Sequence, residues 1–332
     1  MKIVHAGGYS FTLDPLISAQ REAGHECLYP ECLPQGKLLQ PPSGAQQLYL
    51  AIEQIRAFRP DIIHLHSFAS LLFPEGQRTS LEKLLQALKS LGAKVILQTC
   101  PGDFDLVPQS ALDRILCALP LIDYCLVGSP DQTGYFSDPQ KWHRFALPVA
   151  AESFTTRTPP LLAKPGPLRL LLLNSAASEQ DRRALYQALA EARSLSNRVE
   201  VVELDTDTLS SLSQFEEAVL NADVFLDSLR RFWPSEAAII ALACGRLVIA
   251  GPTDPQRPWP QLELSPLMFT DAARIGARLE AIVREPICLR DFSKRSRQYA
   301  LTYHNLSLMS TVLLSVYEKL VAPRPAEPSS GV

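Results

Sequence analysis

The stretch QQLYLAIEQIRAFRPDIIHLH, residues 46–66, decides the fold class. Its first part repeats apolar side chains at helical spacing and predicts an amphipathic helix that ends before Pro60. The residues of that repeat are Leu48, Ile52, Ile55 and Phe58. Residues 61–66 follow at once and form an apolar run of the length of a buried strand. A helix joined to a buried strand in this way is typical of a parallel sheet built from βαβ units.

The same alternation continues outward in both directions along the chain. The further strands that we predict cover residues 2–6, 25–29, 94–99, 124–127, 169–173, 199–204, 223–227 and 247–250. The further helices cover residues 16–24, 79–92, 178–192, 235–244, 271–285 and 290–321, with one more that begins with the cap Ser213-Gln-Phe-Glu216. The sequence therefore predicts an α/β protein with two doubly wound, Rossmann-like domains in tandem.

A proline-rich segment separates the two series. Residues 155–168 hold four of the 27 prolines and predict a semi-rigid, extended linker. We expect a first domain over residues 1–154 and a second over residues 169–300. A helix over residues 301–321 is expected to pack back on the first domain, and residues 322–332 form a frayed tail.

Composition excludes several classes of protein. A net charge of −3 over 332 residues lacks the basic surface of a general nucleic-acid binder. Seven cysteines without a CxxC pair indicate small buried side chains in a reducing compartment. The N-terminus does not resemble a signal peptide, and the longest apolar run, residues 237–250, is shorter than the roughly 20 residues of a membrane span. We therefore expect a cytoplasmic protein without an integral membrane segment.

In such domains ligands bind where parallel strands end, so the loops after the strands carry the candidate site residues. Gly7, Gly8 and Tyr9 follow the first strand. Two glycines allow backbone to approach a ligand closely, or serve only a tight turn. The loop does not have the GxGxxG spacing of a dinucleotide site.

His64 and His66 end the strand of the opening stretch. Alternation along a strand places both side chains on one face of the sheet. A metal pair would need a third ligand, and the spacing of the other histidines, cysteines and acids offers no obvious one. The other interpretation is a pair of hydrogen-bonded histidines at a strand end. His66 is nearer the end of the strand and is a candidate catalytic residue that lines a cleft.

Several segments, in their order along the chain, resemble GT-B glycosyltransferases, and glycosyltransferase family 4 most of all. They are Gly7-Gly8 and residues 23–26, 59–67, 124–129, 147–154, 221–228 and 241–250. The resemblance implies two Rossmann-like domains with a cleft between them, an acceptor site on the first domain and a nucleotide-sugar site on the second. It also implies retaining transfer to an acceptor hydroxyl without a metal ion or a cofactor other than the donor. The acceptor class is a glycan, a lipid or a protein.

The sequence departs from the family at the donor diphosphate. Family members follow the first strand of the second domain with Gly-Arg and then Lys, whereas this chain has Asn174 and Ser175 and no cation before Arg182. Asn174, Ser175 and Arg182 are therefore the donor-binding candidates of this loop. The two family glutamates fall at Phe232 and Ile240. The histidine that family members usually have after the strand Lys94-Val-Ile-Leu-Gln98 is replaced by Thr99-Cys100. These differences weaken the donor site that the resemblance implies.

Other residues remain as candidates for the same chemistry. Ser235 begins a helix whose N–H groups and dipole favour a diphosphate, and ordinary helix capping is the alternative. Arg230 and Arg231 precede it as candidate cations, and Glu236 follows as a candidate acceptor for ribose hydroxyls. Asp103 follows a strand and is the candidate base for the acceptor hydroxyl, with a solvated loop acid as the alternative.

Two other functions remain open. The missing glutamates and cations favour a non-catalytic GT-B-like subunit that binds a protein partner. A sugar-nucleotide epimerase or a phosphorylase shares the same fold type. A phosphorylase would need a lysine for its cofactor, and the lysines from the linker onward, Lys164, Lys294 and Lys319, are not in strand-end loops.

Overall fold

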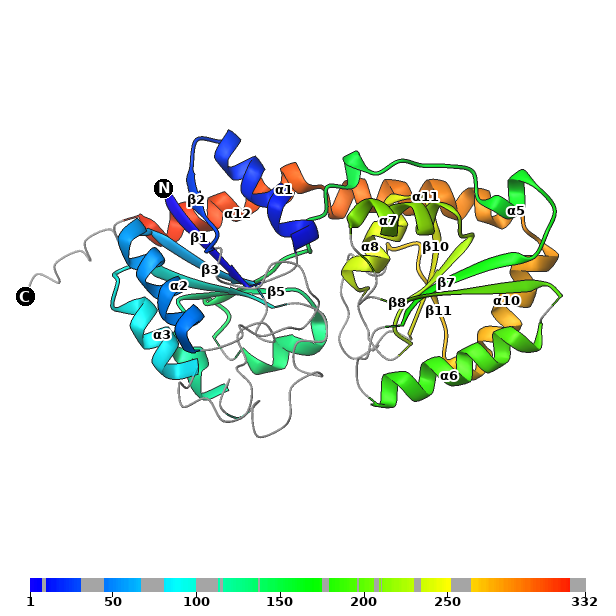
Figure 1. Ribbon diagram of the computed structural model, residues 1–332, viewed down its shortest axis with the longest axis horizontal. Coiled ribbons are helices and arrows are strands. Elements are labelled where there is room, and N and C mark those ends of the chain that lie inside the picture. Colours follow the sequence, from blue (N-terminus) through cyan, green and yellow to red (C-terminus); the bar gives the residue numbers. More distant parts are fainter. Residues whose placement is uncertain are drawn as a thin grey trace, which may run out of the picture.

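The computed structural model has two parallel β-sheets, each covered by helices on both faces (Figure 1). It describes residues 1–7, 10–30, 45–66, 81–99, 113, 116–136, 138–174, 179–195, 197–205, 209, 211–229, 234–251 and 264–322. The strands of both sheets run toward the middle of the molecule in Figure 1, so their carboxyl ends face each other. The predicted pair of doubly wound α/β domains is confirmed.

The first sheet has the strand order β2-β1-β3-β4-β5-β6, and all its pairs are parallel. Its strands are β1 (Lys2–Gly7), β2 (Glu26–Leu28), β3 (Ile62–His66), β4 (Lys94–Gln98), β5 (Tyr124–Val127) and β6 (Trp142–Arg144). The chain moves from β1 to β2 on one side and then to β3 on the other. The winding direction therefore reverses between β1 and β3, and ligands of such sheets bind at that reversal.

The second sheet repeats this topology with the order β11-β10-β9-β7-β8. Its strands are β7 (Leu168–Asn174), β8 (Val199–Asp205), β9 (Val224–Leu226), β10 (Leu247–Ala250) and β11 (Met268–Phe269). Here the reversal lies between β7 and β9. The two domains thus present equivalent edges, one at the ends of β1 and β3 and one at the ends of β7 and β9.

In the described part of the chain, helices cover both faces of the first sheet. Apolar side chains of α2 (Ala45–Phe58) and α3 (Leu81–Lys89) form a core with one face, through Ile55 and Leu85 among others. On the other face, Leu16 of α1 (Ser10–Glu22) packs in one cluster with Leu313 and Tyr317 of α12 (Leu306–Val321). The last helix of the chain therefore completes the core of the first domain (Figure 1).

The second sheet is covered in the same manner. On one face lie α7 (Leu212–Leu220), α8 (Glu236–Ala243) and α11 (Cys288–Tyr303). On the other face lie α6 (Glu179–Ser194) and α10 (Ile275–Arg284), which follows the short helix η5 (Ala272–Arg274). No helix in the described part of the chain is both long and apolar enough to cross a membrane.

The stretch predicted as helical over residues 290–321 is helical for most of its length, but it forms two separate helices, α11 and α12. His304 ends α11, and its Nδ1–H donates to the carbonyl oxygen of Leu147 at 2.9 Å. Asn305 then caps α12, with its Oδ1 accepting the N–H of Leu308 at 2.9 Å. An asparagine that bonds its own backbone in this way competes with a continuous helix.

The predicted extended linker is wrong over Pro160–Ala163, which form the short helix α5. Pro160 stands at the first helical position, where its fixed φ and missing N–H are favourable. The Asp223 carboxylate accepts the N–H of Leu161 at 2.8 Å and that of Arg169 at 2.9 Å. These bonds hold the segment against the second domain.

Two smaller predictions also differ from the structure. Ser211, not Ser213, caps α7, with its Oγ accepting the N–H of Gln214 at 3.2 Å. The edge strands β6 and β11 were not predicted, since runs of three and two residues carry no periodic signal.

Candidate functional site

Gly7 and His66 lie side by side at the reversal point of the first sheet. They end β1 and β3 and are register partners. Gly7 has a φ of 73°, a left-handed conformation that favours glycine. Gly8 and Tyr9 lie outside the described residues, so of the predicted acceptor loop only Gly7 is placed. Asp103, the candidate base, lies outside them too.

Three buried histidines lie on β1 and β3 next to these strand ends. His5 of β1 is the register partner of His64 on β3, and His66 is two residues further along. Their side chains are 0%, 0% and 6% exposed. The ring centroids of His64 and His66 are 3.9 Å apart, and those of His5 and His66 are 5.1 Å apart. We call His5, His64 and His66 the histidine cluster.

Sequence reasoning missed His5, the third member. It considered only residues near His64 and His66 along the chain, whereas His5 comes from another strand. The signal that could have found it is topological. In a doubly wound sheet β1 and β3 are neighbours, so a histidine in the middle of β1 lies beside one in the middle of β3.

The outer nitrogens of the cluster are held by side chains from the helices that cover this face. His5 Nε2–H donates to Gln20 Oε1 of α1 at 2.8 Å, and His64 Nδ1 is 2.5 Å from Tyr317 Oη of α12. With its proton on Nε2, His5 keeps a lone pair on Nδ1. His66 Nε2 lies 2.8 Å from that atom and donates to it. The predicted alternative of hydrogen-bonded histidines thus matches the observed contacts.

Burial keeps the cluster uncharged. Desolvation lowers the pKa of His5 from 6.5 to about 4, and it lowers the pKa values of His64 and His66 well below 6.5. All three imidazoles are therefore neutral at pH 7, and each has one nitrogen lone pair. Neutral imidazoles with free lone pairs are the form that binds metal ions.

The equivalent edge of the second domain has a different chemistry. Asn174 is the last residue of β7, and Ser235 caps α8, with its Oγ accepting the N–H of Ala238 at 3.2 Å. The carboxylate of Asp227, just after β9, accepts the backbone N–H of Ser235 at 2.8 Å. Glu236 begins α8 and is half-buried. The predicted helix cap is therefore observed, together with a carboxylate that sequence reasoning did not use.

The structure does not place the remaining donor candidates. Ser175, Arg230 and Arg231 lie outside the described residues. Arg182 belongs to α6, but its side chain lies outside the description. Of the seven donor candidates, the structure therefore places Asn174 at the end of β7 and Ser235 and Glu236 at the start of α8.

Two residues of the segment that resembles the family are structural. Ile240, at one of the family's glutamate positions, is 2% exposed and belongs to the core of the second domain. Arg246 is buried and donates to the carbonyl oxygens of Val219, Leu220 and Arg157. The guanidinium thus bonds the end of α7 and the linker rather than facing a ligand.

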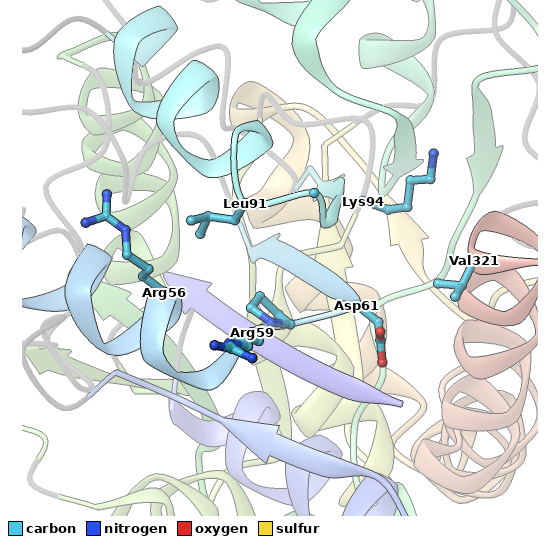
Figure 2. A pocket seen from close by; sticks show the side chains of 8 residues that line it. Arg56, Arg59, Asp61, Leu91, Lys94 and Val321 are labelled. Carbon is cyan, nitrogen blue, oxygen red and sulfur yellow. The ribbon is translucent and has the colours of Figure 1, made fainter.

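A pocket with several basic side chains lies at the other edge of the first sheet (Figure 2). It is lined by Arg56, Arg59, Pro60, Asp61, Leu91, Gly92, Lys94 and Val321. Asp61 and Lys94 stand where β3 and β4 begin, so the pocket is at the amino ends of the strands. Since ligands of such sheets bind at the carboxyl ends, we do not place a substrate there.

No family model matches the chain, and no curated protein matches it in sequence. Solved structures match it in three-dimensional fold. Sucrose-phosphate synthase from Thermosynechococcus elongatus is 15% identical with a TM-score of 0.66, and the match covers 96% of this chain and 99% of that one. Anabaena HepE, solved in complex with UDP-glucose, is 11% identical with a TM-score of 0.64 over 96% and 100% of the two chains. A glycosyltransferase from Rickettsia africae is 14% identical with a TM-score of 0.62 over 96% and 98%.

These similarities show the fold. The chain has the GT-B architecture of glycosyltransferases, with two Rossmann-like domains whose carboxyl edges face each other. The predicted fold class is confirmed. Membership of glycosyltransferase family 4 is not confirmed and stays a prediction.

Proposed function

We propose that this protein is a metal-independent, retaining glycosyltransferase that moves a sugar from a nucleoside-diphosphate sugar to an acceptor hydroxyl. The carrying observation is the pair of reversal points that face each other, one per domain, in an architecture shared with HepE, which was solved with UDP-glucose. A cytoplasmic location and a glycan, lipid or protein acceptor belong to the same proposal.

The donor diphosphate is assigned to the edge of β7 and β9. The N-terminus of α8, capped by Ser235, supplies the positive end of a helix dipole. Asp227 and Glu236 add negative charge at this edge, so a diphosphate requires the cations Arg230, Arg231 and Arg182 to offset it. Glu236 is assigned to the ribose hydroxyls.

Asn174 and Ser175 complete the proposed donor loop. Asn174 ends β7, the strand that lies next to β9, and its amide can exchange hydrogen bonds with a phosphate or a sugar hydroxyl without adding charge. In this proposal, Asn174 and Ser175 make polar contacts at the position where members of glycosyltransferase family 4 have a Gly-Arg pair.

The acceptor is assigned to the edge of β1 and β3. Gly7, Gly8 and Tyr9 form the proposed contact surface. During transfer the bond from the anomeric carbon to the diphosphate breaks, the acceptor oxygen bonds to that carbon, and the hydroxyl proton passes to Asp103. His66 is neutral and bonded to His5, so it contributes by positioning this edge.

The test is the change in melting temperature with UDP-, GDP-, ADP- and dTDP-sugars. A ligand at 100 times its Kd adds about 2.7 kcal/mol of stability, which gives a clear shift. We expect Ser235→Ala and Arg231→Ala to reduce the shift. Ser211→Ala is the matched control, because it removes a cap of the same 3.2 Å geometry from α7. Absence of stabilisation by every nucleotide at millimolar concentration would reject the donor site.

A non-catalytic GT-B-like subunit that binds a protein partner is the second candidate. The observation that favours it is Ile240, whose apolar side chain is buried in the core at a position where the resembling family has glutamate. The two candidates differ in turnover. The second candidate is supported if the protein binds a nucleotide-sugar but does not hydrolyse it and does not transfer its sugar to an acceptor of any class.

A further inference from the structure

We propose that His5, His64 and His66 bind one divalent transition-metal ion of the zinc class. The site lies within the first domain and is independent of the donor chemistry assigned to the second. It goes beyond the proposed function, and it stands or falls on metal binding alone.

The ligand atoms are close enough to share one ion. One nitrogen from each histidine lies within 4.8 Å of those of the other two. Zinc–nitrogen bonds of about 2.0–2.1 Å in a tetrahedral site place the nitrogens roughly 3.3 Å apart. The distance from His5 Nδ1 to His66 Nε2 is 2.8 Å. Binding therefore requires these two nitrogens to move apart by about half an ångström.

The outer nitrogens have the partners that metal-binding histidines use. Gln20 accepts from His5 Nε2, and Tyr317 bonds His64 Nδ1. Such contacts fix the tautomer and the ring orientation of a ligating histidine. They leave His5 Nδ1 and His64 Nε2 as the inner atoms. His66 Nε2 donates to His5 Nδ1 in the ion-free cluster, so it becomes the third ligand only when its proton moves to Nδ1 of the same ring.

Buried polar atoms around the cluster lack partners. Within the described residues, neither His64 Nε2 nor Gln98 Oε1 has a hydrogen-bond partner, and each atom is buried. Gln98 is the register partner of His66 on β4. Unpaired buried polar atoms call for an explanation such as an ion or a water molecule. An ion between the histidines would bond His64 Nε2 directly.

The chemistry of the donor set selects the class of ion. Neutral imidazole favours zinc, copper, nickel and iron over magnesium or calcium, which prefer oxygen. Three protein ligands leave a fourth position for water or another oxygen ligand. His66, the only member of the cluster with any exposed surface, is the one at the carboxyl edge of the sheet.

The experiment is a competitive titration of the chelator-treated, full-length protein with Zn²⁺, together with the visible spectrum of the Co²⁺-loaded protein. We expect one equivalent of tight binding, and d–d bands typical of a tetrahedral nitrogen site. His66→Gln should abolish both. Tyr317→Phe, which removes only a hydroxyl, should weaken binding by about 10–100-fold. His143→Gln, at an exposed position of β6, is the matched control and should bind as the unchanged protein does.

Three results would overturn the proposal. One is the lack of a tight equivalent in the unchanged protein, which would mean that water fills the polar space. Another is equal Zn²⁺ affinity in His66→Gln and His143→Gln. The third is a thiolate-to-cobalt charge-transfer band, which would place the metal on cysteine. Tyr317→Phe decides the question if His66→Gln fails to fold, since unchanged affinity in that variant also rejects the site.

Discussion

The two domains are alike where their strands begin and differ where their strands end. Asp61 directly precedes β3, and its Oδ2 accepts the N–H of Lys2, the first residue of β1, at 2.7 Å. Asp223 occupies the same place before β9 and accepts the N–H of Arg169 on β7 at 2.9 Å. Among the residues that the structure describes, the carboxyl edges share no such pair.

At the carboxyl ends the first domain has neutral imidazoles and a left-handed glycine. The second has a capped helix N-terminus with the carboxylate of Asp227 bonded to Ser235. The contact at the amino edge occurs in both domains and joins neighbouring strands, so we assign it to the fold. Features present in one domain only are the candidates for function.

The largest expected effect is a difference in stability between two substitutions at the amino edges of the two sheets. The Asp223 carboxylate is fully buried and accepts two backbone N–H groups, whereas Asp61 is exposed. We expect Asp223→Ala to lower the free energy of unfolding by about 3 kcal/mol and Asp61→Ala by about 1 kcal/mol. A hydrogen bond to a charged acceptor contributes about 1.5–3 kcal/mol when it is buried and less when it is exposed to water. Urea unfolding measures both. Equal losses would mean that burial does not distinguish the two edges.

The next effect is a dependence of the free energy of unfolding on pH that comes from the buried histidines at the carboxyl edge of the first domain. Burial lowers the folded-state pKa of His5 from 6.5 to about 4, so the unfolded chain binds more protons between these values. Stability from this group is present above pH 6.5 and is lost as the pH falls through that window. From pH 7 to pH 5 the loss is about 2 kcal/mol for His5 alone.

The measurement is the urea midpoint at both pH values. His5→Gln should show a smaller difference between them than the unchanged protein, and His143→Gln, at the exposed position, should show the same difference. A profile that is flat from pH 7 to pH 5 in the unchanged protein would contradict a neutral buried cluster.

The smallest expected effect is the change in stability from a substitution at the carboxyl edge of the second domain. Glu236 begins α8, where a negative charge interacts favourably with the helix dipole. We expect Glu236→Gln to lower the free energy of unfolding by about 0.5 kcal/mol. If Glu236 also accepts ribose hydroxyls, the Kd for the preferred nucleotide rises by more than the Kd for inorganic pyrophosphate. Equal changes in the two Kd values would remove the ribose role.

Local sequence patterns predict the fold well because each central element carries its own signal. The helix of residues 46–58 and the strand that follows lie within one or two residues of α2 and β3. The cap at Ser235 is also observed. The edge strands and the break at His304 depend on contacts with distant segments, such as the Leu147 carbonyl, which no local pattern reports.

The candidate site is less predictable for the same reason. His64 and His66 are visible as a pair along one strand, but His5, Gln20 and Tyr317 join them only through sheet order and helix packing. Asp227 is eight residues before Ser235, and no local pattern reports its bond to the N–H of Ser235. Sequence reasoning identified residue types suited to the chemistry and not their partners.

The most direct test of the different roles of the two edges is hydrogen–deuterium exchange with and without the nucleoside-diphosphate sugar that gives the largest thermal shift. The proposed function predicts slower exchange in peptides that cover the ends of β7 and β9 and the first turn of α8. Peptides covering His5 and His64 in the first domain should change little unless an acceptor is added. Protection confined to the first domain, or none in the first turn of α8, would contradict the account.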